Sequence, residues 1–144
     1  MLTAEAFVGA WRLIGVDFRH ANGQPVPLYG QDPQGLLVYA PSGHMAAQVM
    51  HPRRPATPAS RDDPGALAAY HAIVAGYAAY FGTYTVDAEA GIVLHRVLGS
   101  LLPQWVGSLQ VRHFEFAGQR LTLRLPAEQL GSGLRSGELV WERV

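Results

Sequence analysis

Short β-type runs separated by turn residues recur along the chain, and this alternation most constrains the fold. Residues 11–20 end at Asn22-Gly23, one of the strongest hairpin signals. Residues 35–40 and 44–51 are separated by Pro41-Ser42-Gly43, a second turn of hairpin length. The same alternation resumes in the second half of the chain, where strands are expected at 83–86, 92–100, 108–116, 120–125 and 138–143.

Eight or nine strands joined by short hairpins predict an all-β fold, a closed antiparallel up-and-down β-barrel. A sheet of about eight strands tends to close on itself, which removes exposed edges and leaves room for one small ligand. A β-sandwich is the alternative, and the even spacing of the hairpins favours the barrel.

One α-helix is expected within the barrel sequence, at about residues 64–81, after a proline-rich loop. Asp63 suits the N-cap and Pro64 the first helical position. Gly82 follows as the helix stop. Between Pro64 and Gly82, apolar residues fall at spacings of three and four. This spacing predicts one stripe packed on the barrel, formed by Leu67, Tyr70, Val74, Tyr77 and Phe81.

Composition narrows the class of protein. The chain has 144 residues, of which 49% are hydrophobic and 15% charged, with a formal net charge of zero. We therefore expect one globular domain over residues 1–144, and neither nucleic acid nor a membrane as a partner, because both require clustered positive charge. Cysteine is absent, which excludes disulfides and thiolate metal sites. No targeting segment is recognised, so we expect a cytoplasmic protein, either a monomer or a homodimer.

Several segments together resemble a known family. Gly9-Ala10-Trp11 matches a Gly-x-Trp motif, and the chain continues with LLVYAPSGHMAAQVMHPRRP, GSLLPQWVGSLQVRHFEF and LVWERV. In this order they resemble the lipocalin-like domain family of small bacterial and fungal proteins. The resemblance implies a β-barrel in which Trp11 closes the narrow end and Arg143 packs over it. It also implies either binding of hydrophobic molecules or cyclase or isomerase activity in a natural-product pathway of secondary metabolism.

The strongest functional candidate from the residues themselves is Arg112. It shares one strand face with Gln110, Phe114 and Phe116, and the two phenylalanines favour placing this face inside. A charge there must be paired or must bind an anionic or carbonyl group, since an unpaired buried charge costs several kcal/mol. An internal salt bridge is the structural alternative.

His95 is the second candidate, although either face of its strand can be the inner one. A shift of one residue exchanges His95 with Arg96, just as it exchanges Arg112 with His113. Amphipathic aromatic and amide side chains complete the predicted lining of a mixed pocket. The expected ligand-binding residues are Tyr39, Gln48, Tyr77, Tyr84, His95, Trp105, Gln110 and Arg112.

Two functions therefore stay open. The first is binding of a small, largely hydrophobic molecule that bears a carbonyl or carboxylate. The second is a cofactor-independent cyclase or isomerase, in which Arg112 and Tyr84 or Gln110 polarise a substrate oxygen and His95 is the general base. No metal site and no cofactor are expected, because no tight ligand spacing is present. A haem site would require one histidine to project into a wide lumen.

Overall fold

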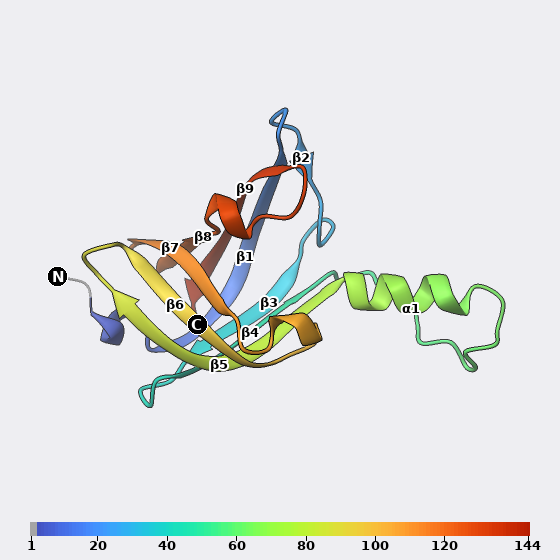
Figure 1. The fold of residues 1–144 in the computed structure, drawn as a ribbon, viewed down its shortest axis with the longest axis horizontal. Helices are drawn as coiled ribbons and strands as arrows, with labels where there is room; N and C mark the ends of the chain where they lie inside the picture. The colour runs from blue at the N-terminus through green and yellow to red at the C-terminus, as the bar shows by residue number, and fades with distance from the viewer. Residues whose placement is uncertain (1–2) are drawn as a thin grey trace.

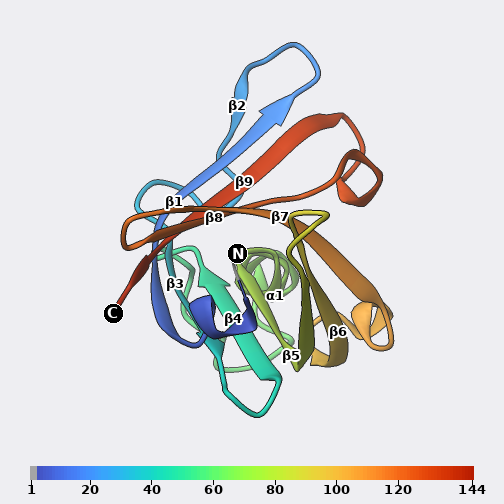
Figure 2. The same ribbon diagram turned by 90° about the vertical axis from the view of Figure 1, so that its left-hand side faces the viewer.

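The computed structural model describes residues 3–144, which form a closed antiparallel β-barrel. Nine strands make one sheet in the order β2-β1-β3-β4-β5-β6-β7-β8-β9, and pairing of β1 with β9 closes eight of them into a ring (Figure 2). This confirms the predicted barrel over the sandwich. The strands are β1 (Gly9–His20), β2 (Pro25–Val26), β3 (Gln34–Tyr39), β4 (His44–Met50), β5 (Tyr77–Asp87), β6 (Ile92–Ser100), β7 (Leu109–Ala117), β8 (Arg120–Arg124) and β9 (Leu134–Arg143).

Three short 3₁₀ turns and one α-helix complete the described residues. The η1 turn (Ala4–Ala6) lies at one end of the barrel, and helix α1 (Ala66–Ala75) extends from the opposite end (Figure 1). The η2 turn (Pro103–Trp105) connects β6 to β7, and η3 (Ala127–Gln129) precedes β9. No helix within residues 3–144 has the length and apolar character needed to cross a membrane.

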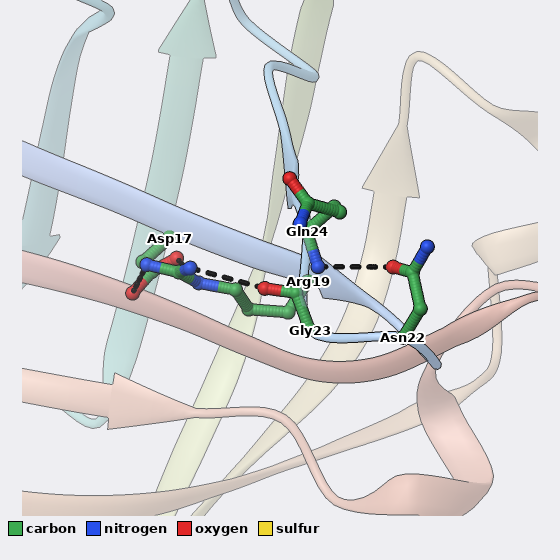
Figure 3. Close-up of polar contacts among 5 residues, drawn as sticks. All are labelled: Asp17, Arg19, Asn22, Gly23 and Gln24. Carbon is green, nitrogen blue, oxygen red and sulfur yellow. Dashed lines mark hydrogen bonds and ion pairs between the residues drawn. The ribbon is translucent and has the colours of Figure 1, made fainter.

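The β1–β2 hairpin forms at the Asn-Gly signal, as predicted (Figure 3). Gly23 has φ +87°, a conformation that side chains with a Cβ rarely adopt. Asn22 Oδ1 accepts a hydrogen bond of 3.0 Å from the Gln24 amide, and Arg19 spans the turn from Asp17 to the Gly23 carbonyl. Local turn chemistry and one arginine therefore fix this hairpin.

The helix is shorter than predicted. It ends at Ala75, and residues 77–81, which we expected in its last turns, belong instead to β5. Met50 pairs with Tyr77 and Ala46 with Phe81, so strand pairing overrides the apolar spacing of this segment. Gly82 is not a helix stop either, because it lies within β5. An added Cβ there would clash with the Arg96 carbonyl oxygen. Its role is to let β5 approach β6 closely.

The predicted packing of the helix on the barrel is also wrong. Leu67 is 84% exposed and Val74 is 45% exposed, because α1 projects away from the strands (Figure 1). Asp63 does not cap the helix: its carboxylate accepts a hydrogen bond from the Ser60 amide, and Gly65 occupies the N-cap position. The turn at residues 60–63 therefore uses the side chain that capping would need.

At the η1 end, the predicted pair of Trp11 and Arg143 is confirmed. Trp11 is 1% exposed, and the Arg143 guanidinium lies 4.1 Å from the centroid of its ring. Arg143 also donates hydrogen bonds of 2.7 and 2.8 Å to the carbonyls of Ala6 and Val8, which fixes the start of the chain against its end. Gly9 has φ +136°, and a Cβ there would lie 2.7 Å from Arg143 Nη1.

Candidate functional site

A small cavity of about 100 Å³ lies inside the barrel. Most of its wall is apolar and comes from inward side chains of β1, β3, β4, β5, β8 and β9, while β6 and β7 contribute the polar groups. Its lining residues are Phe18, Tyr29, Leu37, Ala47, Val49, Ala78, Tyr80, His95, Trp105, Arg112, Leu123, Leu125, Leu139 and Trp141.

The register of β6 places His95 inside the barrel, together with Val93 and Val97. His95 is 1% exposed and lies between two tyrosines from β3 and β5. Tyr39 Oη is 2.6 Å from Nε2, and Tyr80 Oη is 2.6 Å from Nδ1. In the neutral imidazole one ring nitrogen donates and the other accepts, so one tyrosine hydroxyl accepts from the ring and the other donates to it. The three side chains form a continuous hydrogen-bonded chain that reaches the cavity wall at Tyr80.

Burial keeps the three hydrogen-bonded side chains of Tyr39, His95 and Tyr80 uncharged. It lowers the pKa of His95 from its ordinary value of 6.5 to about 3, and the nearby positive charge of Arg112 acts in the same direction. Burial also raises the pKa of Tyr39 well above 10 and raises that of Tyr80, although Arg112 opposes both shifts. At neutral pH the imidazole and both phenols are therefore neutral.

Arg112 carries the charge of the cavity. Its side chain is 6% exposed, and its Nη1 donates to the Val111 carbonyl at 2.8 Å and to Gln129 Oε1 at 2.9 Å. Both acceptors are neutral. The salt bridges found within residues 3–144 join other side chains, so no described carboxylate lies within 4.0 Å of this guanidinium. Glu115, which shares its strand, pairs with Arg124 on the outer surface.

Of the eight residues predicted to bind a ligand, His95, Trp105 and Arg112 line this cavity. Tyr39 lies behind His95 and touches Tyr84 edge to face, with 4.7 Å between ring centroids. Tyr84 is buried and donates a hydrogen bond to the Ala40 carbonyl. These two tyrosines support the wall without forming it.

The other three lie elsewhere. Gln110 is half-buried and donates to Ser108 Oγ at 2.9 Å, beyond the cavity lining. Gln48 is exposed on the outer face of β4, because the inward side chains of that strand are Met45, Ala47 and Val49. Tyr77 donates to Gln48 Oε1 and stacks beneath Arg54. It therefore lies outside the inner cavity.

Sequence reasoning missed Tyr80, Trp141 and Tyr29 as wall residues. The predicted helix includes Tyr80 but leaves it off the apolar stripe, so the spacing gives no reason to expect it inside the barrel. Trp141 and Leu139 are two residues apart on β9 and therefore share one strand face, a signal that marks both as inward. Its Nε1 is buried and has no hydrogen-bond partner among the described residues. Tyr29 lies in the loop between β2 and β3, which carries no strand periodicity.

The fold and its interior cavity define the class of protein as a small lipocalin-like barrel, for which small-molecule binding is the general expectation. The model of the lipocalin-like domain family matches residues 8–144, so the chain belongs to this family. Neither the comparison with curated proteins nor that with solved structures gave a significant match. Within residues 3–144, no cluster of three or more His, Asp or Glu side chains could hold a metal ion.

Proposed function

We propose that this protein binds a small, largely hydrophobic molecule that bears a carbonyl or carboxylate, inside the barrel. The observation that carries the proposal is Arg112, a buried guanidinium on an apolar cavity wall with only neutral protein acceptors. Taking a charge out of water without a counter-charge costs several kcal/mol. A ligand oxygen next to Arg112 would offset this cost.

The apolar wall supports the hydrophobic character of the ligand. Burying apolar surface stabilises a complex by roughly 25 cal/mol per Å². Both ring nitrogens of His95 are already hydrogen-bonded to Tyr39 and Tyr80, so this histidine offers no free nitrogen to a ligand. Arg112 therefore sets the chemistry of the ligand's polar end, and the aliphatic and aromatic wall sets that of the remainder.

The alternative function, a cofactor-independent cyclase or isomerase, receives less support from the geometry. Both ring nitrogens of His95 are already hydrogen-bonded. A general base works best when its pKa lies near the operating pH, whereas the pKa of His95 is about 3. The proposed catalytic partner Tyr84 is bonded to a backbone carbonyl and does not line the cavity.

Native mass spectrometry of protein purified from its own host tests the proposal. Wild type should carry a bound small molecule, and Arg112→Met should lose most of it. A missing charged hydrogen bond costs about 1.5–3 kcal/mol, or roughly a ten- to hundredfold drop in affinity. Arg124→Met is the matched control, because Arg124 lies on the neighbouring strand but pairs with Glu115 and Glu138 on the outer surface. Equal ligand occupancy in both variants would contradict the proposal.

A further inference from the structure

A second cavity adjoins the first at the α1 end of the barrel. It has a volume of about 160 Å³ and shares four wall residues with the inner cavity. The residues that it adds include Val74 and Ala75 of α1 and Leu102 beside η2, and none of its lining residues is charged. The shared wall residues are Tyr29, Ala78, Tyr80 and Trp105.

The shared residues form a narrow aromatic junction between the two spaces. Tyr80 and Trp105 lie with their ring centroids 5.6 Å apart, and Tyr80 is held from behind by its hydrogen bond to His95. Ala78 is the one small residue at this junction. A slender chain of methylenes can pass beside an alanine more easily than a ring system can.

The inner cavity alone is too small for most ligands. Its volume of about 100 Å³ is below the roughly 150 Å³ of an engineered cavity that holds benzene. A molecule that both contacts Arg112 and buries a substantial apolar surface must therefore continue into the second cavity. Such a molecule has a polar head at one end and an apolar tail at the other.

From these two cavities we infer that the ligand is an amphipathic monocarboxylic acid. Its carboxylate lies at Arg112 in the inner cavity, and its unbranched tail passes Ala78 into the outer cavity beside α1. A carboxylate offers only acceptor atoms and a negative charge, which matches a buried guanidinium better than a neutral carbonyl does. The inference rests on the proposed function and deepens it, since it names the class of ligand and the path of its tail.

Helix α1 fits this arrangement. Residues 66–75 contain no Asp, Glu, Lys or Arg, yet most of the helix projects from the barrel. Its last turn contributes Val74 and Ala75 to the outer cavity (the α1 end appears on the right of Figure 1). The helix thus supplies an apolar wall at the end of the barrel where the tail would lie.

Calorimetric titration with butanoate, hexanoate, octanoate and decanoate tests the inference, with methyl octanoate as the neutral probe. Affinity should rise about fourfold per added methylene, which corresponds to ~0.8 kcal/mol of buried CH₂. Methyl octanoate should bind at least tenfold more weakly than octanoate, because the ester lacks the charge.

Two variants separate the tail from the head. Ala75 is exposed and lines only the outer of the two cavities, so Ala75→Trp should fill that space and weaken decanoate binding tenfold or more while leaving butanoate unchanged. Ala72→Trp is the control, since Ala72 is exposed on the same helix and lines neither cavity. Ala78→Phe should block the junction, with the same selective effect.

The outcomes distinguish this inference from the proposed function. Equal affinities along the acid series, or full decanoate affinity in Ala75→Trp, would overturn the two-cavity path while leaving the head site intact. If methyl octanoate bound as tightly as octanoate, the ligand would not be recognised by its carboxylate, and the inference of an acid would be wrong. If no acid binds although native mass spectrometry finds an Arg112-dependent ligand, the inference fails and the proposed function stands.

Discussion

The two ends of the barrel use similar side chains to opposite effect. At the η1 end, Phe7 is fully buried and packs edge to face on Phe114 and Phe116, at centroid distances of 5.0 and 4.9 Å. Trp11 Nε1 donates to the Phe7 carbonyl at 2.9 Å. At the α1 end, Tyr80 and Trp105 instead face cavities. One end is filled, and the other leaves space.

The two arginines show the same contrast. Arg143 uses both terminal nitrogens on backbone carbonyls and covers the face of Trp11, so its whole guanidinium has a structural task. Arg112 uses only Nη1 for its hydrogen bonds within residues 3–144, and it lines a cavity. The proposed binding role of Arg112 therefore rests on donors left free beside a cavity, and not on its burial alone.

The largest expected change in the free energy of unfolding comes from a substitution at the filled η1 end of the barrel. Trp11→Ala should lower the free energy of unfolding by about 3–5 kcal/mol, since it removes a fully buried aromatic ring and leaves Arg143 without its stacking surface. Urea unfolding followed by circular dichroism measures it. Trp105→Ala, at the α1 end, should cost less than about 2 kcal/mol because that ring is half-buried and borders space already. Equal costs would remove the distinction between the ends.

The free energy of unfolding should depend on pH through the buried His95. The pKa of His95 is about 3 in the folded chain and about 6.5 when unfolded, so the unfolded state binds a proton first as pH falls. His95 therefore contributes stability above pH 6.5, and that contribution is lost as pH falls from 6.5 towards 3. The loss approaches about 1.4 kcal/mol per pH unit within this window.

His95→Gln should abolish this slope while keeping one donor and one acceptor for the tyrosines. The measurement is the unfolding free energy of both proteins at pH 7, 6, 5 and 4. Carboxylates also titrate in the lower part of this range, but they do so in both proteins, and the difference between the curves reports His95. Parallel curves would show that the pKa of His95 is the same in the folded and unfolded chain, and its burial between Tyr39 and Tyr80 would then be wrong.

Much of this fold follows from local signals. Asn22-Gly23 defines a hairpin by its own backbone preferences, and Trp11 with Arg143 follows from the family resemblance. The inward face of β7 was also readable, because Phe114 and Phe116 share the parity of Arg112. The hairpin and the inward face of β7 are each decided within a short stretch of sequence, whereas Trp11 and Arg143 lie at opposite ends of the chain and are paired only by the resemblance.

The remainder depends on contacts between distant segments. Residues 77–81 satisfy helical spacing, and only pairing with β4 makes them a strand. Gln48 was predicted inside because its amide side chain suits a mixed lining, whereas its register in β4 turns it to the outer face. Tyr80 joins the site through the same pairing that shortened the helix. The cavity is therefore least predictable where register, which is a non-local property, turns a side chain inward.

The smallest expected effect concerns α1 itself. Leu67 is 84% exposed, so Leu67→Ala should change the unfolding free energy by less than about 0.5 kcal/mol. Leu121, which is fully buried in β8, provides the matched control, and Leu121→Ala should cost about 2–5 kcal/mol. Both are measured by urea unfolding at two protein concentrations. A loss above 1 kcal/mol for Leu67→Ala would mean that the helix is covered in solution. If that loss also grew with protein concentration, a second copy of the chain would be what covers it, and the open end of the barrel would be a contact between subunits.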